Sequence, residues 1–178
     1  MTEPQEEHVR FLRLALDEAR KCEPTPTAFC VGCVIAVKWP STSSEPVVLS
    51  TGFSRELPGN THAEANALAK ARALTPDKLQ SLFPAAPTDG LTAEIILTHS
   101  DIYTTLEPCS IRTSGLAPCS DAIIAAGIPR CYIGVGEPDD FVKCEGAQRL
   151  KQTGVEVIWL TDFEEECLRV ARTGHESK

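Results

Sequence analysis

Four side chains in this sequence have types and positions that could hold a metal ion and use it. His62 and Glu64 lie two residues apart in the stretch NTHAEANAL. Cys109 and Cys119 follow farther along the chain, and each comes directly after a proline. Catalytic zinc usually takes three protein ligands from histidine, cysteine and carboxylates and keeps a fourth position open. We therefore predict a Zn²⁺ ion bound by His62, Cys109 and Cys119.

The residues around these three ligands predict that each of them begins a helix. Proline is favoured in the first turn of a helix, because the N–H that it lacks would have no partner there in any case. A helix start also carries partial positive charge and free N–H groups. Both lower the pKa of a thiol and favour the thiolate, which is the form that binds metal. We expect His62, Cys109 and Cys119 all to lie at helix starts.

Glu64 is predicted to be catalytic and not a fourth metal ligand. Zinc held by one imidazole and two thiolates can still bind water and lower its pKa from near 16 to about 7. In the first turn of its helix, Glu64 can reach that water and act as general acid and base. Zinc deaminases combine His-x-Glu with later Pro-Cys ligands in this way. A lone His-x-Glu is common at helix starts, so the prediction depends on the combination.

A purely structural zinc site is the alternative, and it would need a fourth protein ligand. Cys131 is the nearest candidate, but it begins a predicted buried strand. The other histidines, His8, His99 and His175, are interpreted as bystanders. Four cysteines within apolar patterns are interpreted as small buried side chains: Cys30, Cys33, Cys131 and Cys167.

The segment between the two predicted thiol ligands is unusually long. Nine residues, SIRTSGLAP, separate Cys109 from Cys119, whereas the common deaminase pattern places two residues between its cysteines. We expect this segment to form a loop at the rim of the metal site. Arg112, Thr113 and Ser114 offer a cation, hydroxyl groups and backbone N–H groups, which together suit a phosphate group. The alternative is a solvated surface loop that contains an arginine.

The hydrophobic pattern predicts a single α/β domain over residues 1–178. Strands and helices alternate in the second half, which favours parallel strands with helices on both faces of the sheet. We predict a three-layer α/β/α domain around a five-stranded mixed sheet, with residues 75–92, which contain three prolines, as a long surface excursion. Expected strands lie within 29–39, 47–54, 95–108, 131–136 and 155–160, and expected helices within 6–21, 62–74, 119–127, 144–154 and 162–174, the last capped by Asp162.

Composition and charge disfavour several kinds of partner. The chain is 42% hydrophobic and 24% charged, as is usual for soluble globular proteins. Its net charge of −8 gives no broad attraction to phosphate backbones, so nucleic acid is disfavoured. No stretch approaches the roughly 20 apolar residues of a membrane span, and the acidic N-terminal residues lack a signal core. We expect a cytoplasmic protein with no membrane partner, in which the cysteines form no disulfide framework.

Several longer motifs are similar to a known superfamily. Along almost its whole length the sequence resembles the cytidine-deaminase-like proteins. STGFSRELPGNTHAEANAL, YTTLEPCSIRTSG, IGVGEPDDFV and EGAQRLKQTGVEVIWL resemble the fungal form of the riboflavin-pathway pyrimidine deaminases. The resemblance implies the cytidine-deaminase-like fold, the zinc ligands named above and Glu64 as proton shuttle. It also implies a substrate, 2,5-diamino-6-ribitylamino-4(3H)-pyrimidinone 5′-phosphate, which loses its 2-amino group as ammonia.

The same resemblance suggests substrate contacts. Asn60 is expected to contact the substrate, and the loop with Glu137, Asp139 and Phe141 matches a segment near the pocket of the family. Ala28 stands where many bacterial relatives have an asparagine that is expected to contact substrate, which leaves the substrate pose open. Bacterial relatives also carry a fused reductase domain, for which a sequence of 178 residues has no room, so we expect a stand-alone deaminase here.

Three alternative functions remain open at this point. One is a deaminase of another free nucleotide or base, and a second is a tRNA deaminase of the same fold. The acidic charge and the few aromatic residues available for base stacking disfavour the second. The third is a zinc-stabilised interaction domain without catalysis, which the presence of Glu64 disfavours. By resemblance, the protein is expected to form a homodimer.

Overall fold

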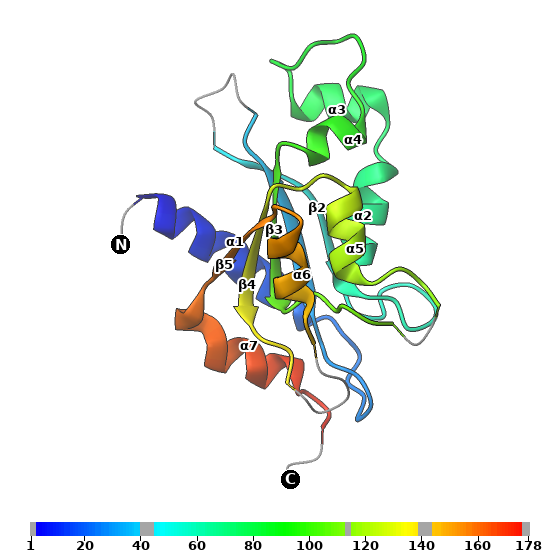
Figure 1. The fold of residues 1–178 in the computed structure, drawn as a ribbon. Helices are drawn as coiled ribbons and strands as arrows, with labels where there is room; N and C mark the ends of the chain where they lie inside the picture. The colour runs from blue at the N-terminus through cyan, green and yellow to red at the C-terminus, as the bar shows by residue number, and fades with distance from the viewer. Residues whose placement is uncertain (1–2, 40–44, 113–114, 139–143, 176–178) are drawn as a thin grey trace.

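The computed structural model describes residues 3–39, 45–112, 115–138 and 144–175. At its centre lies a five-stranded sheet with the strand order β2-β1-β3-β4-β5 (Figure 1). β1 is antiparallel to both β2 and β3, whereas β3, β4 and β5 are parallel to one another. The strands span Gly32–Val37 (β1), Val47–Phe53 (β2), Ser100–Leu106 (β3), Arg130–Val135 (β4) and Glu156–Trp159 (β5).

Helices cover both faces of this sheet, which confirms the predicted three-layer α/β/α architecture (Figure 1). Helices α1 and α7 pack on one face, and α2, α5 and α6 pack on the other. Two short helices, α3 and α4, lie beyond one end of the sheet (Figure 1). The helices span Glu3–Ala19 (α1), Ala63–Arg72 (α2), Pro76–Leu82 (α3), Ala93–Leu97 (α4), Cys119–Ala125 (α5), Gly146–Gln152 (α6) and Glu164–Ala171 (α7).

β1 shows why its sequence is apolar throughout. Successive side chains of a strand point to opposite faces of the sheet. Cys33, Ile35 and Val37 join the core beneath α2, while Val34 and Ala36 pack with Phe11 of α1 on the other face. All six residues of β1 are buried, because the strand has neighbours on both edges and helices on both faces.

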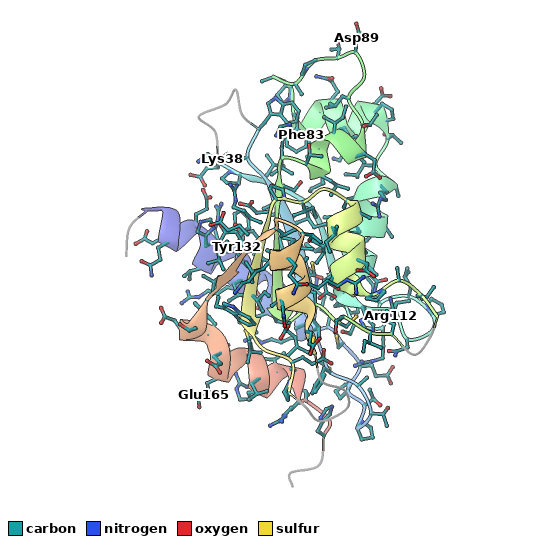
Figure 2. The ribbon with its side chains drawn as sticks, viewed as in Figure 1. Lys38, Phe83, Asp89, Arg112, Tyr132 and Glu165 are labelled. Carbon is teal, nitrogen blue, oxygen red and sulfur yellow. The ribbon has the colours of Figure 1, made fainter. Side chains whose placement is uncertain are left out.

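Residues 75–92 are mostly exposed, as the prediction of a surface excursion requires, but they contain a helix and several buried apolar side chains that were not predicted. Residues Pro76–Leu82 form α3, with Pro76 in the first turn and the Thr75 hydroxyl accepting a hydrogen bond from the Lys78 N–H. Leu79 and Phe83, four residues apart, are both buried in the core beneath α2. Phe83 lies between the two short helices and the end of the sheet (Figure 2). The three prolines of this segment indicated a loop, although Leu79 and Phe83 have the spacing of one face of a helix.

Two helix boundaries also differ from the prediction. Ala93–Leu97 forms α4, where the sequence suggested a turn before β3. Asp162 does not cap α7, because Thr161–Phe163 forms a 3₁₀ helix and α7 begins only at Glu164. Three glutamates occupy the first turn of α7, where negative charge stabilises the helix start in place of a side-chain cap. None of the helices within the described ranges is long and apolar enough to cross a membrane.

Candidate metal centre and substrate pocket

Three predicted ligands from distant parts of the chain meet beside the end of β3. One donor atom each from His62, Cys109 and Cys119 lies within 4.8 Å of the other two. His62 Nδ1 is 3.5 Å from the Sγ atom of each cysteine. Tetrahedral zinc with Zn–S near 2.3 Å and Zn–N near 2.0 Å requires an S···N separation of about 3.5 Å. The donor types and their spacing therefore fit a zinc ion.

Two of the three donors lie at helix starts, as predicted. His62 is the residue before the first turn of α2, with an extended backbone. Cys119 is the first residue of α5 and follows Pro118. Both helices therefore direct their positive ends at the cluster, which favours a thiolate there.

The prediction that Cys109 begins a helix is wrong. Cys109 lies in an irregular segment after β3, and its environment comes from α5 instead. The Cys109 Sγ atom accepts a hydrogen bond from the Cys119 N–H at 3.3 Å. The Cys109 carbonyl oxygen accepts two more, from the Ser120 N–H at 3.2 Å and the Ser120 hydroxyl at 3.1 Å. The start of one helix thus serves both cysteines, so Cys109 needs no helix of its own.

Electrostatics within the cluster favour a thiolate at Cys109. The hydrogen bond from the Cys119 thiol, together with those from His62 and the Cys119 N–H, lowers the pKa of Cys109 well below its usual range. Burial opposes this shift but does not cancel it. The same hydrogen bond raises the pKa of the Cys119 thiol, which is its donor. A divalent metal ion would therefore find Cys109 ready as a thiolate and would have to displace the proton of Cys119 to bind both sulfurs.

Glu64 is buried beside the cluster, with only 3% of its surface exposed. Burial, followed by the negative charge of Cys109, raises the pKa of Glu64. The Thr104 hydroxyl lies 3.2 Å from Glu64 Oε1 and 2.9 Å from the Leu106 carbonyl oxygen. Because one hydroxyl proton cannot serve both acceptors fully, a protonated Glu64 can donate to Thr104 while Thr104 donates to Leu106. A carboxyl group with a raised pKa and a hydroxyl partner can both accept and donate a proton.

A comparison with known families bears directly on this cluster. Residues 5–135 match the family described as the cytidine and deoxycytidylate deaminase zinc-binding region. The chain belongs to this deaminase family. The matched range contains all three donors and Glu64, and zinc is the metal that the family binds.

Individual relatives of the family are similar over most of the chain. The diaminohydroxyphosphoribosylamino-pyrimidine deaminase of Schizosaccharomyces pombe is 42% identical over 171 residues, which cover 96% of this chain and 36% of that protein. The chain thus spans about a third of the length of the curated relatives it matches.

Solved structures of the Aspergillus oryzae Rib2 deaminase, as a C-terminal deletion mutant, share the fold. At pH 4.6 the TM-score is 0.73 with 33% identity, covering 96% of this chain and 93% of that one. A structure in complex with DARIPP gives a TM-score of 0.70 with 30% identity, covering 96% and 92%. The predicted fold of this deaminase family is thereby confirmed.

A pocket of about 320 Å³ opens next to the metal cluster of this family member. Of the residues predicted to contact substrate, Asn60 and Arg112 line it, and Arg112 donates from Nη2 to the Asn60 carbonyl oxygen at 2.8 Å. Figure 2 shows Arg112 on the loop beside α5. Ala28 and Glu137 also line the pocket. The remaining predicted contacts, Thr113, Ser114, Asp139 and Phe141, lie outside the described residues.

Three polar residues in or next to this pocket were not predicted from the sequence. Thr104 contacts Glu64, as described above, and nothing in its strand pattern marks it. Glu107 lines the pocket and accepts a hydrogen bond from the Ala147 N–H at 2.8 Å. Glu107 directly precedes Pro108 and Cys109, and this position could have indicated that it lies near the metal site. Arg55 also lines the pocket, and no local pattern distinguishes it from a surface arginine.

Glu137 adds a second carboxyl group of perturbed acidity to the pocket. Burial raises the pKa of Glu137 to about 7. Glu64, Glu107 and Glu137 line the pocket together with Arg112, so the pocket presents acceptors for amino groups and a donor for an anion. A ring with amino substituents and a phosphate would satisfy both kinds of group.

Proposed function

We propose that this chain catalyses the hydrolytic deamination of 2,5-diamino-6-ribitylamino-4(3H)-pyrimidinone 5′-phosphate in riboflavin biosynthesis. The single observation that carries the proposal is the His62, Cys109 and Cys119 cluster with Glu64 buried beside it at an open pocket. Support comes from the name of the Schizosaccharomyces pombe relative and from the Rib2 complex with DARIPP.

The proposed chemistry divides between the metal ligands and one carboxyl group. His62, Cys109 and Cys119 would hold zinc, which when bound supplies the activation of water. Glu64 accepts the proton of the water and delivers protons to a ring nitrogen and to the departing amine. Substrate and water thus give a ring carbonyl and ammonia. Thr104 orients the carboxyl group of Glu64 by a hydrogen bond to Oε1.

The phosphate end of the substrate is assigned to the part of the pocket formed by Arg112. Arg112 lines the pocket and, with Thr113 and Ser114, is proposed to bind the phosphate group. Asn60 lines the pocket two residues before His62, and its carbonyl oxygen accepts a hydrogen bond from Arg112. We propose that its side chain contacts the substrate, because the backbone contact fixes its position at the pocket.

The quaternary state and location belong to the same proposal. We infer a cytoplasmic homodimer of a single deaminase domain. Ile111 and Leu116, on the loop between the two cysteines, are 61% and 57% exposed. Apolar side chains this exposed on one loop suit a contact with a second copy of the chain. Light scattering coupled to size-exclusion chromatography measures the mass in solution.

The decisive experiment measures ammonia release by the zinc-loaded protein with ribityl and ribosyl forms of the phosphorylated diaminopyrimidine. We expect turnover of the ribityl form. Glu64→Gln keeps the size of the side chain and should retain zinc while activity falls by about 10²- to 10⁴-fold, the usual contribution of general acid–base catalysis. Glu94→Gln, at an exposed glutamate of α4, is the matched control and should remain active.

Other outcomes identify the alternative functions. Turnover of cytosine-type nucleotides or of tRNA alone would assign a different substrate to the same cluster. Stoichiometric zinc with no ammonia from any of these compounds would favour a zinc-stabilised interaction domain. A fully active Glu64→Gln variant would show that the assigned proton shuttle is wrong.

A further inference from the structure

Arg55 carries two energetic costs at the edge of the pocket. Its φ angle is +62°, a left-handed conformation that costs a residue with a Cβ atom about 1–2 kcal/mol. Its Nε atom is buried and has no hydrogen-bond partner among the described residues. Unfavourable features of this kind persist where the surrounding structure needs them, and they are frequent at functional sites.

The guanidinium group of Arg55 holds a segment distant in sequence. Nη1 donates to the Phe29 carbonyl oxygen at 3.0 Å, and Nη2 donates to the Glu23 carbonyl oxygen at 2.8 Å. Nη2 also lies 3.4 Å from the Cys30 Sγ atom. One planar group thus fixes both ends of the segment 23–30, a geometry that the fork of arginine provides and lysine does not.

This segment forms one wall of the pocket. Thr27, Ala28 and Phe29 line the pocket, but the segment belongs to none of the helices or strands and contains only an isolated bridge between Thr25 and Ala28. On its outer side it is held by the end of α7, where the Cys30 N–H donates to the Ala171 carbonyl oxygen at 2.8 Å. His175 Nε2 also lies 3.2 Å from the Ala28 carbonyl oxygen. Arg55 adds the hydrogen bonds to the Glu23 and Phe29 carbonyl oxygens, which join this segment to the loop that begins at Ser54.

Arg55 also fixes the opposite wall through its backbone. Its N–H donates to the Thr61 carbonyl oxygen at 2.7 Å, which closes the loop 54–61. That loop carries Asn60, whose carbonyl oxygen binds Arg112. The left-handed conformation at Arg55 allows one residue to make this backbone bond and to direct its side chain at the segment 23–30.

We propose that Arg55 is a positioning residue, which fixes the wall 23–30 relative to the loop 54–61 and so determines the affinity of the pocket for its substrate. The inference rests on the proposed function for the identity of that substrate. It does not assign Arg55 to zinc binding or to proton transfer, since its side chain binds Glu23, Phe29 and Cys30 and neither the donor cluster nor Glu64.

The test compares Arg55→Gly, Arg55→Lys and the wild-type protein, all loaded with zinc. Glycine accepts the positive φ angle without strain, so Arg55→Gly removes the guanidinium group without adding backbone strain. Loss of two hydrogen bonds from a charged group should raise KM about tenfold or more. We expect kcat within about threefold of wild type, because the groups proposed to act in the chemical step remain. Arg55→Lys should recover only part of the affinity.

Hydrogen–deuterium exchange gives a readout that needs no substrate. Amides of residues 27–31 should exchange faster in Arg55→Gly, while those of α2 should not change, because local opening is confined to the released segment. Arg72→Gln is the matched control, since Arg72 pairs with Glu94 at an exposed site. It should change neither KM nor exchange in the wall.

Each outcome decides the proposal. Unchanged KM in Arg55→Gly, with or without faster exchange, would overturn the link to substrate affinity. Lost zinc, or a large fall in kcat alone, would also overturn it, because Arg55 would then act on the metal centre. If the wild-type protein releases no ammonia from the phosphorylated pyrimidines, the proposed function fails, and exchange at residues 27–31 still decides whether Arg55 holds the wall.

Discussion

Replacement of Gly146 by alanine should destabilise the backbone that positions the metal ligand Cys109. Gly146 begins α6 and packs directly against the backbone of Pro108, the residue before Cys109. A Cβ atom at this position would lie 1.7 Å from the Pro108 carbonyl oxygen, whereas real Cβ contacts are essentially never shorter than 3.0 Å. Accommodating Gly146→Ala therefore requires a relative shift of at least about 1.3 Å, and the neighbouring atom is backbone and not a flexible side chain.

The shift must disturb either α6 or Cys109. Overpacking of this kind costs about 1–3 kcal/mol, which corresponds to a decrease in Tm of roughly 2–12 °C for a chain of this size. Zinc–ligand distances tolerate deviations of only about 0.2 Å, so a displacement of Cys109 several times larger should weaken zinc binding markedly. If α6 moves instead, the hydrogen bond between the Ala147 N–H and Glu107 lengthens and zinc affinity changes little.

Two measurements distinguish these outcomes. Chelator competition gives the zinc affinity of Gly146→Ala, and thermal unfolding with and without chelator gives the stability of the metal-loaded and metal-free forms. Gly136→Ala is the matched control, because a Cβ atom there would lie 3.7 Å from Glu107 Oε2, an ordinary contact. We expect a lower Tm in Gly146→Ala in either case. If Cys109 is the part that moves, the zinc affinity should be weaker as well. Wild-type values of both quantities would refute the close packing against Pro108.

Two further predictions concern the rest of the fold. Phe83→Ala should lower the free energy of unfolding by about 3–5 kcal/mol, measured by denaturant titration, because Phe83 is buried in the core beneath α2; a loss under 1 kcal/mol would mean that Phe83 does not pack in this core. His8 lies between the hydroxyl groups of Tyr103 and Tyr132, and burial lowers its pKa below the ordinary 6.5. Below pH 6.5 the unfolded chain therefore binds a proton that the folded protein does not, so the wild-type protein should lose stability relative to His8→Gln as the pH falls from 7.5 to 5.5; a pH-independent difference would contradict this.

Much of the sheet could be predicted because its signals are local. β1 is apolar throughout and β4 is almost so, as strands with neighbours on both sides must be. Glycines end the helices α5 and α6, at Gly127 and Gly154 in left-handed conformations. The alternation of strand and helix then requires parallel pairing of β3, β4 and β5, which the structure confirms.

The failures arise where a tertiary contact replaces a local signal. Three prolines in residues 75–92 indicate a loop, but Leu79 and Phe83 find a hydrophobic core that the local pattern does not reveal. The proline before Cys109 predicts a helix start, as Pro118 does before Cys119, because proline is favoured in the first turn of a helix. The N–H groups that bind the sulfur and the carbonyl oxygen of Cys109 belong to Cys119 and Ser120, ten and eleven residues away, so the residues next to Cys109 could not indicate them.

The positions of the metal donors follow from one structural arrangement. The carboxyl end of β3 leads directly to Cys109, and the starts of α2 and α5 point at the same place with His62 and Cys119. Hydrogen bonds from Ser120 and the close packing of Gly146 hold the backbone around Cys109 from two sides. Because protein contacts position these donors and a large apolar core lies beneath α2, the fold does not depend on zinc as a small zinc-stabilised module does. Chelation should therefore remove metal-dependent activity while leaving cooperative unfolding intact, which also separates a catalytic site from a structural one.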